Sequence, residues 1–149
     1  MNIINEKGKT LIKTYEGLKL KSYKCSAGVP TIGYGATFYE NGTKVKMADV
    51  ITKERAEQLF DYHIKLFSDK VAKVVPELNS NQFSSLVSFA FNVGIGNFKS
   101  STLLKKVKVN PQDESIGDEF LRWNKAGGKE IKGLTTRRNA EKELYFSEI

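Results

Sequence analysis

Three residues able to take part in bond cleavage lie close together in the segment YEGLKLKSYKCSAGVPTIGYG, which runs from Tyr15 to Gly35. They are Glu16, Cys25, which is the single cysteine of the chain, and Thr31. A carboxyl group partly surrounded by apolar side chains can stay protonated near neutrality and act as a general acid. Glycoside hydrolysis needs such an acid on one side of the scissile bond, and a nucleophile or a water-positioning group on the other. Spacing alone is compatible with this chemistry, but it leaves open that Glu16 is a solvated helix-end charge and Thr31 an ordinary strand residue.

The pattern around these residues predicts a helix that ends beside Glu16 and a small antiparallel sheet after it. Apolar residues recur at helical spacing over about 3–15, and Gly17 is expected to end this helix. From Leu20 to Val45 the sequence is rich in turn residues, and Asn41-Gly42 is a strong hairpin signal. Two or three short strands are therefore expected.

The remainder of the chain is predicted to be helical. Thr52 can cap a long helix over about 53–74, which ends before Pro76. Asn79 and Gln82 have capping-box spacing, and the segment that they open is apolar on most sides, which predicts a buried central helix. The remaining features are breaks at Gly94 and Gly96, a short helix over about 101–108, a helix over about 111–125 that starts at Asn110-Pro111 and stops at Gly127-Gly128, and a last helix over about 135–147.

The composition is that of an ordinary globular domain with a basic surface. The chain has 149 residues, of which 40% are hydrophobic and 28% charged, so it can bury a real core. One cysteine cannot form an internal disulfide, and no apolar run approaches the length of a membrane span. The net charge of +7 favours contact with polyanions such as nucleic acid, acidic lipid or an anionic cell envelope. We therefore expect an α+β protein, in which a small antiparallel β-hairpin lobe is joined by a long helix to a larger helical lobe, with a cleft between them.

The segment from Glu16 to Gly35 resembles the catalytic segment of the phage-type lysozymes, the endolysin muramidases of glycoside hydrolase family 24. That pattern is Glu, eight residues, Asp or Cys, five residues, Thr, and then Ile-Gly-x-Gly. The resemblance continues through SFAFNVGIGNFKSSTLLKKV (Ser88 to Val107) and FLRWNKAGGKEIKGLTTRRNAEKELY (Phe120 to Tyr145), and so covers nearly the whole chain. It implies a lysozyme-like fold in a single domain over 1–149, with a β-containing lobe at about 16–55 and a helical lobe at about 75–149 on which residues 1–15 pack.

The resemblance also implies an activity and roles for individual residues. The activity is hydrolysis of the β-1,4 bond between N-acetylmuramic acid and N-acetylglucosamine in bacterial peptidoglycan, which leads to host cell lysis. Glu16 would be the general acid, with Cys25 and Thr31 positioning or activating water. Arg138, or less readily Arg137, would orient Glu16. The implied substrate-binding positions are Tyr34, Thr37, Phe91, Asn92 and Thr102. Core packing is an equal alternative for Phe91, and Trp123, the single tryptophan, is expected to be a core residue.

Cys25 departs from the commoner form of the family, which has an aspartate there and inverts the anomeric configuration. A free thiol has a pKa of about 8.5 and is mostly neutral at pH 7. Water positioning, action as a thiolate base and nucleophilic attack with retention are all open, and so is a purely structural role as a small buried side chain. We favour water positioning or base catalysis.

Three other functions compete with this interpretation. A nucleic-acid binder would explain the charge, but the basic residues are scattered and form no recognised motif. A cysteine hydrolase would pair Cys25 with His63, the single histidine, which lies on an apolar helix face. The serious alternative is a non-catalytic lysozyme-fold protein that binds peptidoglycan or the envelope.

Partners and location follow mainly from the resemblance. We expect peptidoglycan as the partner, no nucleic acid, no stable membrane insertion, a monomer, and neither a metal nor another cofactor. The N-terminal residues lack an apolar signal-peptide core, so synthesis in the host cytoplasm is expected. The resemblance implies release across the inner membrane through a separate holin-type membrane protein, followed by action on the cell wall.

Overall fold

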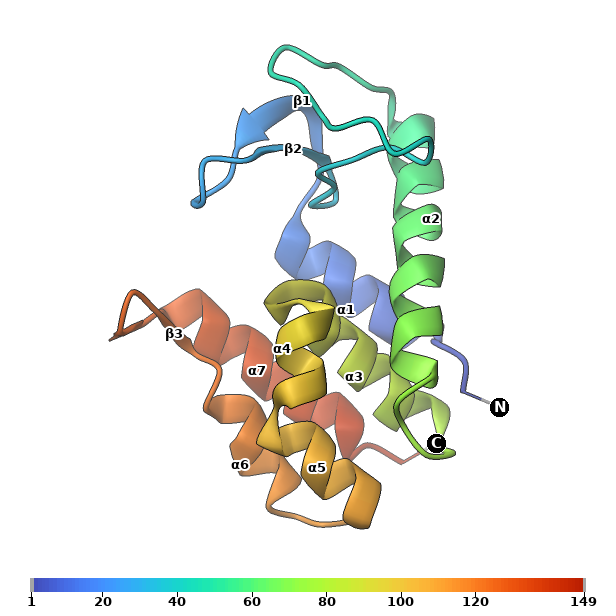
Figure 1. Cartoon of the computed structure of the whole chain (residues 1–149), viewed down its shortest axis with the longest axis vertical. Helices are drawn as coiled ribbons and strands as arrows, with labels where there is room; N and C mark the ends of the chain where they lie inside the picture. Colours follow the sequence, from blue (N-terminus) through green and yellow to red (C-terminus); the bar gives the residue numbers. More distant parts are fainter. Residues whose placement is uncertain (1, 149) are drawn as a thin grey trace. The chain divides into compact units, whose positions relative to one another are not determined.

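The structure is a computed structural model that describes residues 2–148. The chain is mainly helical and contains a few short strands (Figure 1). In order, the elements are α1 (Glu6–Glu16), β1 (Lys19–Lys24), β2 (Pro30–Gly33), α2 (Lys53–Ala72), α3 (Ser80–Val93), α4 (Ile95–Ser100), α5 (Thr102–Val109), α6 (Ile116–Leu121), β3 (Lys125–Ala126), β4 (Lys129–Glu130) and α7 (Lys132–Tyr145). Within the described residues, no helix is both long and apolar enough to cross a membrane.

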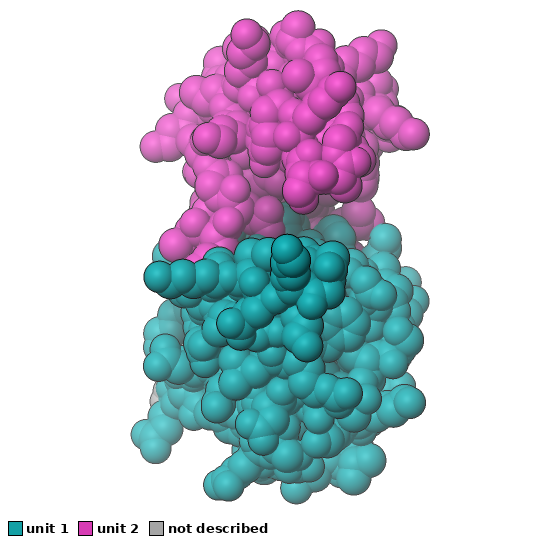
Figure 2. All heavy atoms as spheres, turned by 90° about the vertical axis from the view of Figure 1, so that its left-hand side faces the viewer, with its two compact units in different colours: residues 1–12, 67–149 teal, residues 13–66 magenta. Residues whose placement is uncertain are grey.

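The chain divides into two compact units, coloured separately in Figure 2. Residues 13–66 form the hairpin unit, and residues 1–12 with 67–149 form the helical unit. Helices α1 and α2 each contribute residues to both units. The division into lobes at about 16–55 and 75–149 within a single domain stays a prediction.

The hairpin unit is built on a two-stranded antiparallel sheet. Strand β1 pairs with β2 so that Lys19 lies opposite Gly33 and Tyr23 opposite Thr31, with an irregularity between these pairs. The small core of this unit contains Ile32 of β2 together with Ala36, Val45 and Leu59, and Tyr39 and Ile51 pack against it. The expected Asn41-Gly42 turn is present: Gly42 has φ of +86°, and Tyr39 N–H donates to the Thr43 carbonyl at 2.8 Å. Its flanks form only an isolated bridge between Phe38 and Lys44.

Helix α2 begins where its sequence predicts. The backbone N–H of Arg55 donates to the Thr52 hydroxyl at 3.1 Å, which satisfies one of the amide groups left open at a helix start. The helix ends at Ala72, two residues before the predicted end. Its early turns carry Leu59 and Phe60, both buried, into the hairpin unit.

The helical unit is organised around α3, as predicted. Asn79 accepts from the backbone N–H of Gln82, and the Gln82 side chain accepts from the backbone N–H of Asn79, which completes the capping box. The helix is buried from Asn81 to Ala90 and packs on α7. Gly94, with φ of +95°, ends it.

Several other predicted helix boundaries were wrong. Helix α1 begins at Glu6 rather than near residue 3 because the Asn5 side chain accepts from the backbone N–H of Gly8 at 3.0 Å, as an N-cap does. Gly96 does not break the chain but lies inside α4. The last helix begins at Lys132 and ends at Tyr145.

The predicted helix over 111–125 was also wrong, since only Ile116–Leu121 is helical. The side-chain oxygen of Asn110 accepts from the backbone N–H of Gln112, and that of Asp113 accepts from the backbone N–H of Ser115. Such local side-chain bonds compete with helix formation and hold this segment in turns. Gly127-Gly128 does more than stop a helix, because these residues form the tip of the β3–β4 hairpin, both with positive φ.

Candidate active site

Glu16 is the last residue of α1 and lies against the turn that follows β2. Gly17, with φ of +72°, takes the chain out of the helix. A Cβ atom added to Gly35 would lie 2.6 Å from Glu16 Oε1, so the carboxyl group packs directly on the backbone of that glycine. Gly35 also has φ of +82°, which disfavours other residues. The glycine therefore leaves room for the carboxyl group of Glu16.

Cys25 lies in the tight loop between β1 and β2. Its backbone N–H donates to the Val29 carbonyl at 3.0 Å, and its own carbonyl accepts from Gly28 at 2.8 Å. Hydrogen bonds from the backbone N–H groups of Val29 and Ala27 lower the pKa of the half-buried thiol, with partial opposition from burial. Cys25 therefore has more thiolate character than an ordinary cysteine.

Thr31 is buried on β2, beside the Cys25 loop. Its hydroxyl donates to the Val29 carbonyl at 2.9 Å. The same hydroxyl also contributes to lowering the pKa of the Cys25 thiol, so the two side chains lie together. The structure thus brings thiol and hydroxyl to one place within the hairpin unit.

Tyr23 is a member of this site that sequence reasoning missed. It is half-buried on β1 opposite Thr31. Burial raises the pKa of its phenol, and the negative charges of Glu16 and the Cys25 thiolate raise it further. Tyr23 thus lies within electrostatic reach of both groups. The alternation in KLKSYK could have placed it on the Thr31 face only if the strand register had been known.

The two predicted sugar-contacting residues of the hairpin unit have different surroundings. The Tyr34 hydroxyl donates to Glu57 Oε1 at 3.1 Å, and its ring meets the Phe60 ring edge-on at a centroid distance of 5.3 Å. Thr37 is half-buried, and its backbone carbonyl accepts from Val45. Substrate contact remains a prediction for both residues.

The predicted residues of the helical unit are partly accessible. Phe91 is half-buried and tilts against Phe67, with 5.0 Å between ring centroids. Asn92 and Thr102 are exposed, and Asn92 accepts from Arg138 Nη2 at 2.5 Å.

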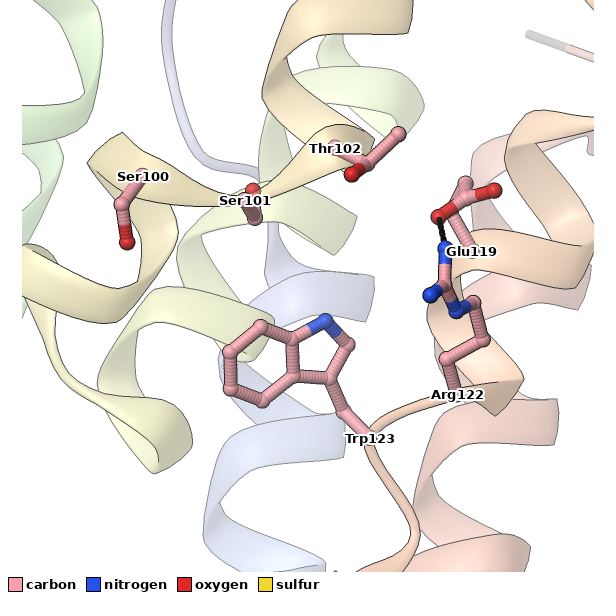
Figure 3. Close-up of a pocket in the computed structure, with 6 residues that line it drawn as sticks. All are labelled: Ser100, Ser101, Thr102, Glu119, Arg122 and Trp123. Atoms are coloured by element: carbon pink, nitrogen blue, oxygen red, sulfur yellow. Dashed lines mark hydrogen bonds and ion pairs between the residues drawn. The ribbon is translucent and has the colours of Figure 1, made fainter.

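Thr102 lines a pocket of about 360 Å³ in the helical unit, which we call the Trp123 pocket. Figure 3 shows the indole of Trp123 on one side of the Ser100–Thr102 segment, with the Glu119–Arg122 ion pair across the pocket. Trp123, expected in the core, is half-buried: it packs edge-on against Phe89 and also faces the pocket.

Arg137 and Arg138 are buried and pair with one carboxylate. Arg138 Nε lies 3.0 Å from Glu141 Oε1, and Arg137 Nε lies 3.3 Å from Glu141 Oε2. Arg137 Nη2 also donates to the Ser88 carbonyl at 3.2 Å. Two cations therefore share a carboxylate in the helical unit, and the orientation of Glu16 by either arginine stays a prediction.

His63 has a structural environment that disfavours the cysteine–histidine alternative. The ring is buried, its Nε2 lies 2.9 Å from the Phe38 carbonyl oxygen, and the Phe38 and Tyr62 rings pack edge-on against it. Burial lowers its pKa. In the described part of the chain, no group of three or more His, Cys, Asp or Glu side chains is arranged to hold a metal ion.

Comparison with known proteins places this chain in a family. Residues 13–141 match the family model described as phage lysozyme, and the chain therefore belongs to the phage lysozyme family. The endolysin of Bacillus phage B103 is 41% identical over 150 residues, which cover 97% of this chain and 54% of that protein. The endolysin of Acyrthosiphon pisum secondary endosymbiont phage 1 is 42% identical, with 97% and 98% covered. This chain thus spans about half the length of the Bacillus phage relative.

A solved structure shows the same fold. The endolysin from Escherichia coli O157:H7 phage FAHEc1 superposes with a TM-score of 0.87 at 34% identity, covering 99% of this chain and 95% of that one. The predicted lysozyme-like α+β fold is confirmed. The cleft expected between its lobes remains a prediction.

Proposed function

We propose that this protein is an endolysin that hydrolyses the β-1,4 bond between N-acetylmuramic acid and N-acetylglucosamine of bacterial peptidoglycan. Two contacts in the hairpin unit of this phage lysozyme family member carry the proposal. The Glu16 carboxyl group packs on Gly35, and the Cys25 thiol lies beside the Thr31 hydroxyl. Family membership supports a glycosidase, and these residues supply an acid together with polar groups suited to holding water.

In this proposal Glu16 gives its proton to the leaving oxygen as the glycosidic bond breaks. Cys25 and Thr31 orient a water molecule toward the anomeric carbon, and that water supplies the new hydroxyl group. The reaction then needs only one carboxyl group, because the thiol and the hydroxyl position the water.

The lowered pKa of Cys25 supports a role for the thiolate as the base that takes a proton from this water. Direct attack by the thiolate on the anomeric carbon would instead form a covalent intermediate and retain configuration. We favour a role for Cys25 in positioning or activating water, because the Thr31 hydroxyl lies beside the thiol and both groups can hydrogen-bond to one water molecule.

The glycan contacts are also part of the proposal. Tyr34 and Thr37 in the hairpin unit, and Phe91, Asn92 and Thr102 in the helical unit, would contact the sugar chain. The Trp123 pocket supports a glycan contact for Thr102, which lines it. The pocket combines an aromatic ring, hydroxyl groups and an ion pair, and this combination suits a polar ligand. Arg138, with Arg137 as the second choice, would orient Glu16.

A second function is favoured by one observation, the thiol where the commoner family form has an aspartate. In that case the protein would bind peptidoglycan or the envelope without cutting it. For either function we propose a monomer of a single domain that is released across the inner membrane with the help of a holin-type protein.

Purified peptidoglycan tests the proposal. Wild-type protein should release new reducing ends, and Glu16→Gln, at the same folded concentration, should release almost none while still pelleting with the insoluble wall. Wall binding without new reducing ends from the wild type would favour the non-catalytic alternative.

A further inference from the structure

A second polar cluster lies within the hairpin unit, one helical turn from Glu16. Lys13 Nζ lies 2.6 Å from Glu57 Oε2, and the Tyr34 hydroxyl donates to the other oxygen of the same carboxylate at 3.1 Å. The Lys13 ammonium also lies 5.3 Å from the centroid of the Tyr34 ring and 4.9 Å from that of Phe60. We call Lys13, Tyr34 and Glu57 the Lys13 cluster.

The cluster joins the three elements that determine where the Glu16 carboxyl lies. Lys13 precedes Glu16 by three residues on α1, so both lie on neighbouring positions of the same helix face. Tyr34 is the neighbour of Gly35, on which the carboxyl packs. Glu57 lies on α2 and holds both residues through one carboxylate. Movement of either Lys13 or Tyr34 would shift one side of the contact between Glu16 and Gly35.

The charges of the cluster support a persistent arrangement. Burial acts to lower the pKa of Lys13, but the hydrogen bond and negative charge of Glu57 outweigh it, so that pKa is raised. The hydrogen bond from Lys13 lowers the pKa of Glu57 despite burial, and Tyr34 adds to the effect. Both groups therefore stay ionised across the neutral range.

We propose that Lys13, Glu57 and Tyr34 are positioning residues for the proposed hydrolysis, which hold α1, the turn after β2 and α2 together so that the Glu16 carboxyl stays against Gly35. The inference rests on the proposed function of Glu16. It gives Tyr34 a role through its hydroxyl that differs from direct contact with sugar. The cluster acts through Glu16 and takes no proton from the substrate.

The experiment measures kcat and KM for reducing-end release from solubilised glycan strands, together with the free energy of unfolding. Glu57→Ala removes the shared acceptor and should lower kcat by up to about 100-fold with little change in KM, because a misplacement of about 1 Å can cost that much. Glu57→Gln keeps one acceptor oxygen, for Lys13, and an amide group that can donate to the Tyr34 hydroxyl, so it should restore much of kcat. Tyr34→Phe removes one hydroxyl and should lower kcat by a smaller factor.

The same unit offers a matched control. Arg55 and Glu40 form an ion pair with side chains 35% and 34% exposed, compared with 34% and 36% for Lys13 and Glu57. Both pairs involve a residue of α2, but Glu40 contacts neither α1 nor Tyr34 in any hydrogen bond or ion pair of the described residues. Glu40→Ala should lose a similar amount of stability and keep kcat.

The outcomes separate the proposals. A lower kcat for Glu57→Ala, restored in Glu57→Gln and absent in Glu40→Ala, supports the positioning role. An unchanged kcat in folded Glu57→Ala overturns the positioning role while the proposed function stands. If Glu57→Ala does not fold, an unchanged kcat in Tyr34→Phe has the same meaning. An equal loss in Glu40→Ala also overturns the positioning role. Full turnover by Glu16→Gln would overturn the proposed function itself.

Discussion

Two turns of the hairpin unit each contain a glycine with a similar positive φ, but the two glycines have different surroundings. The first, Ile32–Ala36, contains Gly35 with φ of +82°, and the second, Tyr39–Thr43, contains Gly42 with φ of +86°. A Cβ atom at Gly35 would collide with the carboxyl group of Glu16, whereas one at Gly42 would meet nothing within 4 Å. Each turn also has a nearby glutamate, Glu16 at the first and Glu40 in the second.

The difference shows that one backbone requirement can serve two purposes. At Gly42 the glycine serves only the turn, as is typical of Asn-Gly. At Gly35 it serves the turn and also the close approach of a carboxyl group. Changes at the first turn should therefore alter catalysis, and matched changes at the second should alter stability alone.

The largest expected difference is between the two glutamates. Glu16→Gln should lower the rate of reducing-end release by about 100- to 10,000-fold, the range that a positioned general acid contributes. Glu40→Gln should leave this rate unchanged because Glu40 pairs with Arg55 and not with the proposed site. Initial rates on purified peptidoglycan check both, and equal activity of the two variants would contradict the comparison.

The next difference is between the two glycines. Gly35→Ala and Gly42→Ala should each cost about 1–2 kcal/mol of stability, since both place a side chain in the left-handed region. Only Gly35→Ala should also reduce turnover, by about 10- to 100-fold, because its methyl group displaces Glu16. Denaturant unfolding and initial rates separate the two effects. Similar turnover by both variants would show that the close contact at Gly35 has no catalytic meaning.

A smaller effect is expected at Cys25, beside the first turn. Cys25→Ala should lower turnover about tenfold if the thiol helps to hold or activate water. Because backbone N–H groups lower the pKa of the thiol, its alkylation rate should reach half-maximum at a pH below the value of about 8.5 for free cysteine. Iodoacetamide labelling followed by mass spectrometry gives the profile. Full activity after complete alkylation would remove Cys25 from the mechanism.

The smallest expected effect concerns stability at the second turn. Arg55 lowers the pKa of Glu40 from 4.5 to about 2 in the folded protein. A lowered folded-state pKa contributes stability above the unfolded value, and this contribution is lost as pH falls from about 4.5 to about 2. Glu40→Gln should thus be less stable than wild type at pH 7, by under about 1 kcal/mol, and the difference should disappear in that acid window. A difference that persists at pH 2 would contradict this origin.

Much of the fold could be predicted because its signals are local. The Asn79–Gln82 capping box, the Thr52 cap and the apolar central helix each depend on residues within a few positions of one another. The helix prediction for residues 111–125 was wrong for a reason that is also local. Asn110 and Asp113 can cap a helix or close a turn, and helical periodicity does not distinguish these uses.

The site was less predictable because its contacts join residues that are far apart in the sequence. Glu16, Cys25 and Thr31 were found through a family pattern, but Tyr23 needed the register of β1 on β2. The bond between Lys13 and Glu57 joins residues 44 positions apart, and no periodicity in either helix indicates it. Close packing of Glu16 on Gly35 likewise depends on how α1 meets the turn after β2.

The most direct test of the central claim is the chemical identity of the new chain ends. Purified peptidoglycan is digested with the wild-type protein, reduced with borohydride and analysed by mass spectrometry. Our account predicts reduced N-acetylmuramic acid at the new ends, in amounts that Glu16→Gln fails to produce. Reduced N-acetylglucosamine, anhydro-muramic acid or no new ends at all would contradict it.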